Sequence, residues 1–123
     1  MLKVQTRHLG NVTVFCLAGR FVNGETATLR QAVNSQSEAG TVVLDLSKVT
    51  TIDASGLGLL LDLRRQVESR GVRFRLMNAT KFVNHIFQIT RLNAVFEVIP
   101  RAELNPSIAR TRPASMIEFA SCA

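Results

Sequence analysis

The stretch VVLDLSKVTTIDASGLGLLLDL, residues 42–63, decides how this chain folds. It opens with a nearly continuous apolar run, typical of a β-strand covered on both faces, which we place at Thr41 to Leu46. Its end repeats leucine at helical spacing, which predicts an amphipathic helix that Gly71 terminates. The segment SKVTTID, residues 47–53, is expected to be a short connection. These features indicate an α/β unit in which a buried strand leads into a helix.

Periodic patterns on both sides of this unit predict the remaining elements. Apolar and polar residues alternate in two runs that flank Gly10-Asn11, a tight-turn signal, so the chain opens with a β-hairpin. Downstream, strand patterns alternate with helix patterns, which favours right-handed crossovers and parallel pairing. The predicted fold is therefore α/β, a four- to five-stranded mixed sheet with helices mainly on one face, in the order β-β-α-β-α-β-α-β. The predicted strands are residues 2–9, 12–19, 41–46, 72–78 and 95–99, and the predicted helices are residues 24–40, 55–71 and 80–92.

Length and composition set the boundaries of this fold. The chain has 123 residues, which suits one domain, and 46% of them are hydrophobic, which argues against wholesale disorder. Pro100, Pro106 and Pro113 interrupt any periodic pattern after the last predicted strand. We therefore expect a single domain at residues 1–100 and a C-terminal tail at residues 101–123 that is either flexible or loosely docked.

The overall chemistry narrows the kinds of partner. The formal net charge of +6 favours acidic partners, but Trp and Tyr are absent, and a single-strand nucleic-acid binder usually carries such stacking aromatics. The longest uncharged apolar run, Ala54 to Leu61, is shorter than the roughly 20 residues that span a bilayer. The N-terminus lacks the long apolar core of a signal peptide. We expect a cytoplasmic protein that binds no nucleic acid and does not insert into a membrane.

The spacing of reactive residues does not support catalysis. The sequence lacks G-x-G-x-x-G, the phosphate-binding motif G-x-x-x-x-G-K and the hydrolase motif G-x-S-x-G. A serine nucleophile such as Ser55 would need a base, and the only histidines are His8, in the first predicted strand, and His85, in the last predicted helix. Two histidines and two cysteines are too scattered for a zinc site. We predict a protein that is not an enzyme and has no catalytic residue, no cofactor and no metal.

The start of the central helix is the strongest candidate site. It follows the carboxyl end of the central strand, at the edge where binding sites collect in open α/β sheets. The first backbone N–H groups of a helix have no internal partner, and the helix dipole favours anions there. Gly56 and Gly58 allow the backbone to approach a neighbour closely. The position is therefore physically suited to a phosphate.

These residues closely resemble the signature of the STAS family, the sulphate-transporter and anti-sigma-factor-antagonist domain. The family pattern is a hydrophobic strand ending in Asp-Leu-Ser, a short connection, Asp-Ser-Ser/Thr-Gly-Leu-Gly and a leucine-rich helix. The stretch VNHIFQITRLNAVFEVI, residues 83–99, also resembles the last helix and strand of the family, and the resemblance covers residues 1 to about 100. The residues that match the long motif are Asp45, Leu46, Ser47, Asp53, Ser55, Gly56, Leu57 and Gly58.

The resemblance implies binding, not catalysis. Soluble single-domain members look like anti-sigma factor antagonists, bacterial transcription regulators whose unmodified form binds an anti-sigma factor, a serine kinase of the ATP-binding type. In the family this kinase phosphorylates the serine directly after the aspartate, a position that Ala54 occupies here, so Ser55 is the only acceptor left. Arg91 stands where the family often has glycine, so we expect a less regular helix end. The implied partner-binding residues are Asp53, Ala54, Ser55, Gly56, Leu57 and Gly58.

Several alternatives stay open from the sequence. We interpret Ser55 as a helix cap, which would present its hydroxyl poorly to a kinase, and Asp53 is either a cap or part of the recognition surface. The arginines of the central helix and the next strand form either a solvated face, which we favour, or a docking patch for an acidic partner. The alternative function is that of a structural or adaptor STAS subunit of a transporter or signalling scaffold. The arginines in question are Arg64, Arg65, Arg70, Arg73 and Arg75.

Overall fold

The structure is a computed structural model that describes residues 2–35 and 40–99. Within these residues the chain forms five strands, three α-helices and one short 3-10 helix. In chain order they are β1 (Lys3–Leu9), β2 (Val12–Phe21), α1 (Ala27–Asn34), β3 (Thr41–Ile52), α2 (Ala54–Glu68), β4 (Arg73–Met77), α3 (Lys81–Ile89), η1 (Leu92–Ala94) and β5 (Glu97–Ile99). The tail predicted at residues 101–123 lies outside the described residues.

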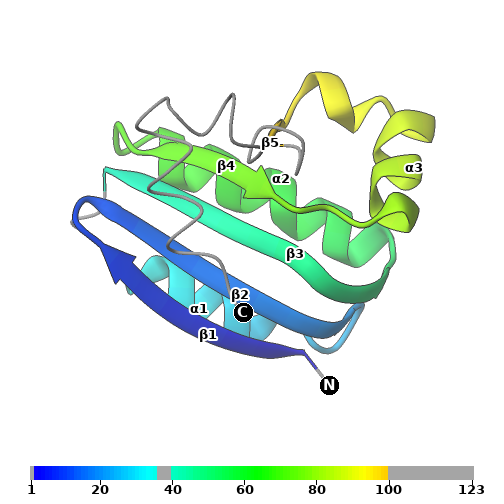
Figure 1. Cartoon of the computed structure of the whole chain (residues 1–123), viewed down its shortest axis with the longest axis horizontal. Coiled ribbons are helices and arrows are strands. Elements are labelled where there is room, and N and C mark those ends of the chain that lie inside the picture. The colour runs from blue at the N-terminus through cyan, green and yellow to red at the C-terminus, as the bar shows by residue number, and fades with distance from the viewer. Residues whose placement is uncertain (1, 36–39, 100–123) are drawn as a thin grey trace, which may run out of the picture.

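The strands form one mixed sheet in the order β1-β2-β3-β4-β5 (Figure 1). β1 and β2 are the predicted antiparallel hairpin, in which Leu9 pairs with Val12 across a two-residue loop that begins with Gly10 at φ 58°. β2, β3, β4 and β5 pair in parallel with one another along the rest of the sheet. The predicted α/β fold with a mixed sheet is confirmed, and the sheet has five strands.

β3 is longer than the sequence pattern predicted, and this difference positions the candidate site. Residues 47–52, predicted to be a connection, continue the strand to Ile52. The second half of β2, residues 18–21, pairs with this extension after a register shift. Because the pairing partner is remote in sequence, the local pattern did not reveal the extension. Asp53 is therefore the only residue between the end of β3 and the start of α2.

Side chains from all three helices join one apolar core against the sheet. Leu29 of α1, Leu60 of α2 and Phe87 of α3 are fully buried in the same cluster as the strand residues Phe15 and Leu44. Figure 1 shows α1 and α2 lying behind the strands. The prediction of helices mainly on one face of the sheet is confirmed, and this packing fixes where α2 begins relative to the sheet edge.

α3 ends with an arginine in a conformation that usually belongs to glycine. Thr90 closes the helix, and Arg91 then adopts the left-handed region at φ 61° and ψ 19°. A left-handed residue after the last helical turn commonly ends a helix, and glycine is preferred there because it has no Cβ. Arg91 therefore takes the conformation that a glycine would take at this helix end, and the 3-10 helix η1 follows it immediately.

Two further properties of the described residues concern a membrane-spanning helix and a metal site. None of the helices formed by residues 2–35 and 40–99 is long and apolar enough to cross a membrane. Over the same ranges, no group of three or more His, Cys, Asp or Glu side chains is placed to hold a metal ion.

Candidate functional site

The aspartate that follows β3 caps the first turn of α2. Asp53 has an extended backbone, with φ −117° and ψ −174°, and its Oδ1 accepts a hydrogen bond from the backbone N–H of Gly56 at 3.0 Å. This contact satisfies one of the N–H groups that a helix start leaves without an internal partner. The interpretation of Ser55 as the cap is therefore wrong. Ser55 is the second residue of the helix, two positions after the cap.

The same carboxylate holds a second segment of the chain. Asp53 Oδ2 accepts a hydrogen bond from the backbone N–H of Asn23 at 3.1 Å, and the Asp53 N–H donates to the carbonyl of Phe21 at 3.3 Å. Asn23 lies in the loop between β2 and α1, residues 22–26. One side chain therefore fixes this loop and the start of α2 relative to each other.

These backbone donors also stabilise the ionised form of the Asp53 carboxyl. The hydrogen bond from Asn23, followed by the one from Gly56, lowers the pKa of the Asp53 carboxyl below its ordinary value of 3.8. Hydrogen bonds to the ionised form favour that form. The site therefore carries a negative charge at neutral pH, at the helix end where the dipole favours an anion.

Gly56 is a packing residue and does not form part of an accessible surface. A Cβ added to Gly56 would lie 2.4 Å from the carbonyl oxygen of Phe21 and 2.5 Å from its Cδ1 atom. Gly56 is buried, so the backbone of α2 rests directly on the end of β2. Gly58 is different, because it is exposed and a Cβ there would meet no atom within 4 Å.

Small side chains form the exposed part of the site. Ala54, Ser55 and Gly58 are exposed, and Leu57 is half-buried beside them. The Ser55 hydroxyl makes no hydrogen bond to the parts of the chain that the structure describes. The six residues predicted from the sequence therefore lie together on one helix turn but divide into two groups. Asp53 and Gly56 build the site, whereas Ala54, Ser55, Leu57 and Gly58 present its surface.

The sequence reasoning missed the contribution of β2 and the loop after it. Asn23 contacts the site through its backbone N–H, so its side-chain identity gave no signal, and Phe21 contacts it through both its carbonyl oxygen and its ring. An aspartate directly before a helical pattern is a signal for a helix cap. The sequence therefore indicates Asp53, beside Ser55, as a candidate cap.

The two histidines do not belong to this site. His8 lies on β1, where Thr13 Oγ1 is 3.4 Å from its Nδ1 atom, and His85 is exposed on α3. Neither is hydrogen-bonded to Ser55 within the described residues.

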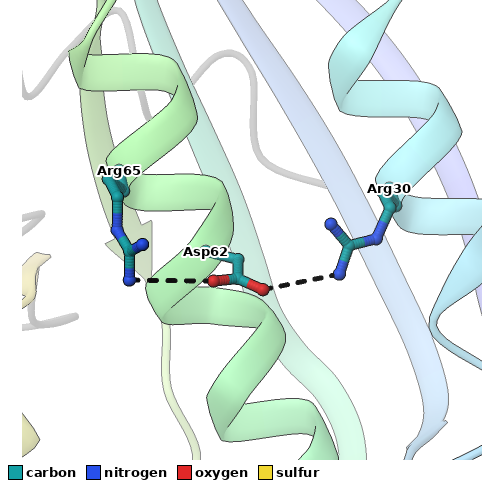
Figure 2. Close-up of polar contacts among 3 residues, drawn as sticks. All are labelled: Arg30, Asp62 and Arg65. Atoms are coloured by element: carbon teal, nitrogen blue, oxygen red, sulfur yellow. Dashed lines mark ion pairs between the residues drawn. The ribbon is translucent and has the colours of Figure 1, made fainter.

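Of the five arginines in question, Arg64, Arg65 and Arg75 lie in separate ion pairs. Asp62 of α2 lies between Arg30 of α1, at 3.6 Å, and Arg65 of its own helix, at 3.9 Å (Figure 2). Further along, Arg64 pairs with Glu68 on α2, and Arg75 of β4 pairs with Glu97 of β5. Exposed pairs of this kind contribute little to stability. They favour the solvated face over a continuous docking patch.

Comparisons with known proteins agree with this geometry. The chain shares its fold with the "Anti-Sigma Factor Antagonist SpoIIAA in its Unphosphorylated Form", at 22% identity and a TM-score of 0.69 over 90% of this chain and 97% of that one. The "Bacillus Cell Fate Determinant SpoIIAA in the Phosphorylated Form" gives 22% identity and a TM-score of 0.64 over 89% and 100%. An "Anti-sigma Factor Antagonist from Mycobacterium paratuberculosis" gives 21% identity and a TM-score of 0.71 over 90% and 92%.

The sequence match extends slightly beyond the predicted domain. The STAS domain family matches residues 3–109, whereas we placed the domain boundary at residue 100. The match includes the whole described sheet, all three helices and the helix start that Asp53 caps. The sequence match and the fold together show that this chain belongs to the STAS domain family.

Proposed function

We propose that this chain is a non-enzymatic regulator that binds a protein partner through the start of α2. The observation that carries the proposal is the exposure of Ala54, Ser55 and Gly58 on a helix start that two hydrogen bonds to Asp53 hold in place. A pre-organised surface loses little conformational entropy on binding, and small side chains let a partner approach the helix closely. We call this the helix-start surface: Ala54, Ser55, Leu57 and Gly58 form it, and Asp53 and the buried Gly56 support it.

The partner we propose is an anti-sigma factor, or a serine kinase of the ATP-binding type. The STAS family assignment supports this choice, as does the fold shared with SpoIIAA, which is described as an anti-sigma factor antagonist. The proposal includes no nucleic acid and no insertion into a membrane. It places the encounter in the cytoplasm, where a kinase finds ATP.

Control by phosphate is the second part of the proposal. Ala54 has no hydroxyl, so the surface is not switched at the position where the family pattern carries its acceptor. Because Asp53 caps α2, the reason for expecting the Ser55 hydroxyl to be shielded no longer holds. We propose that any phosphate on this surface is carried by Ser55. It would add about −1.5 to −2 charges beside the Asp53 carboxylate and weaken binding.

The experiment begins with recovery of the partner from the native cell lysate. The wild-type chain and an Ala54→Asp variant serve as parallel baits, and mass spectrometry identifies proteins that only the wild type retains. Titration of the recovered partner should then show about tenfold weaker binding for Ala54→Asp, equivalent to about 1.4 kcal/mol, because a charge enters the interface. Ser55→Ala should retain binding. Ala54→Ser should gain phosphate if the partner is a kinase of the expected type.

The matched control is Gln66→Asp, which adds the same charge to an exposed position near the other end of α2. It should bind as tightly as the wild type. Equal affinity of Ala54→Asp and wild type would place the interface elsewhere on the domain. Recovery of a transporter ATPase or a scaffold protein in place of an anti-sigma factor or kinase would favour the adaptor function.

A further inference from the structure

The sheet face that points away from the helices carries its own apolar cluster. We call it the open face, and its core consists of Val14, Cys16, Val43, Met77 and Ile99. These residues alternate along β2, β3, β4 and β5 with residues that face the helices, and their neighbours in the pairing register belong to the same face. They are at most 7% exposed, and Asp45, which pairs with Cys16 and Met77 on the same face, is 2% exposed.

The described elements do not account for this burial. Among the residues that the structure describes, only strand residues belong to the open-face cluster, with Leu9 and Val12 packed at its margin. The helices contribute their buried residues to the other cluster. On a bare sheet face the side chains would be exposed, whereas Val43 and Leu44, which lie on opposite faces of β3, are both fully buried. The open face therefore has a cover of its own.

The position of the last strand identifies a cover within this chain. Ile99, the last residue of β5, is itself a member of the open face, so the chain leaves the sheet beside it. The remaining chain to Ala123 could reach any point of this face, at up to about 3.3–3.6 Å per extended residue. It supplies apolar side chains for the purpose: Leu104, Ile108, Met116, Ile117 and Phe119.

The cysteines connect the same two parts of the molecule. Cys16 lies in the open face and is disulfide-bonded. The sequence contains one other cysteine, Cys122, near the C-terminus. A disulfide within one chain can therefore only join Cys16 to residues 101–123.

We propose that the open face is the docking surface for the chain's own residues 101–123, and that a disulfide between Cys16 and Cys122 fastens them. The two thiols lose two electrons and two protons in forming the bond, and a small-molecule disulfide of the glutathione type accepts both and leaves as two thiols. Reduction releases the fastening while the apolar contacts remain. The open face is then reserved for this segment, and the helix-start surface at the edge of the sheet stays free.

The disulfide is tested on the full-length protein. After equilibration with oxidised glutathione, the chain is blocked with iodoacetamide and digested without reduction. Mass spectrometry should find the peptides that contain Cys16 and Cys122 joined and lighter by two hydrogens than their sum. Separate alkylated peptides, or a dimer joined through two copies of Cys16, would overturn the proposal.

The apolar docking is tested without the disulfide. In a Cys122→Ser protein, Cys16 is the only thiol, and its alkylation rate reports how well the open face is covered. Adding Ile117→Asp and Phe119→Asp should speed alkylation by about tenfold or more, because charges in the segment prevent it from docking. The matched control adds Ser107→Asp and Thr111→Asp, which bring the same charge at polar positions and should leave the rate unchanged.

Circular dichroism of each variant confirms that the sheet stays folded during the measurement. Equal alkylation rates in the docking pair and the control pair would show that the segment does not cover Cys16. A Cys122→Ser protein that reacts as fast as the urea-unfolded chain would show that nothing covers it. Either result contradicts the proposal and leaves the proposed function at the helix-start surface unaffected.

Discussion

At the scale of single residues, the helix start depends on one carboxylate and one missing side chain. Asp53 accepts hydrogen bonds from Gly56 and Asn23, so it caps α2 and holds the neighbouring loop together. Gly56 allows that turn to rest on Phe21 without a gap. The residues of the STAS motif that look most like a binding signature are therefore partly structural. The exposed contact surface is formed by the small residues Ala54, Ser55 and Gly58.

Replacement of Gly56 by alanine should show this structural role. The new Cβ would lie within 2.5 Å of two Phe21 atoms, one of them a backbone oxygen that cannot move aside cheaply. Overpacking of this kind costs about 1–3 kcal/mol, and we expect the upper end. Urea denaturation, followed by circular dichroism, measures the loss of unfolding free energy.

Gly58→Ala is the matched control for this substitution. Gly58 lies in the same helix, but a Cβ there meets no atom within 4 Å, so alanine should stabilise by about 0.5–1 kcal/mol. If both variants shifted stability in the same direction, close packing at Gly56 would not be the reason for glycine at that position.

At the scale of elements, the lengths and ends of strands and helices are set by different forces. α3 begins at a threonine cap, because Thr80 Oγ1 accepts a hydrogen bond from the N–H of Val83 at 3.2 Å. It ends with Arg91 in the left-handed region, where no glycine is available. A β-carbon in this conformation costs about 1–2 kcal/mol, so the packing around η1 holds the arginine there against its preference.

Arg91→Gly should therefore stabilise the protein. Relief of the left-handed conformation outweighs the extra freedom that glycine gains in the unfolded chain, and the net gain should be about 0.5–1 kcal/mol. His85→Gly, at an exposed position in the middle of α3, is the control and should cost about 0.5 kcal/mol. Thermal unfolding of both variants checks the opposite signs, and a destabilised Arg91→Gly protein would show that the arginine side chain itself supports the helix end.

At the scale of the whole molecule, the sheet separates two apolar layers that serve different purposes. One layer holds the helices and so determines where α2 begins, and the other forms the open face. The helix-start surface lies at the edge where β3 ends, so it is supported by the first layer without being covered by it. The dispersed ion pairs on the outside add little to this arrangement.

Leu44→Asp should unfold the domain, because Leu44 lies in β3, the central strand of the sheet, and is completely buried in the helix-facing layer. A buried charge without a partner costs several kcal/mol, a large share of the roughly 5–15 kcal/mol that holds a domain together. Lys48→Asp, on an exposed position of the same strand, should cost about 1 kcal/mol or less. A Leu44→Asp protein that kept its melting temperature would contradict the placement of β3 in the centre of the sheet.

The sequence by itself determined the order of elements, the hairpin at Gly10-Asn11 and the location of the candidate site at Asp53 to Gly58. These features are encoded locally, in the spacing of apolar residues and in turn and cap residues, so a single stretch of chain shows them. Only the tertiary structure decided that β3 continues to Ile52, that Asp53 is the cap and that Gly56 packs on Phe21. Each of these depends on β2 or on the loop after it, whose backbone atoms supply the pairing partner, the second hydrogen-bond donor and, together with the Phe21 ring, the close contact. Backbone groups are the same in every residue, so no pattern of side chains in the sequence could indicate these backbone contacts.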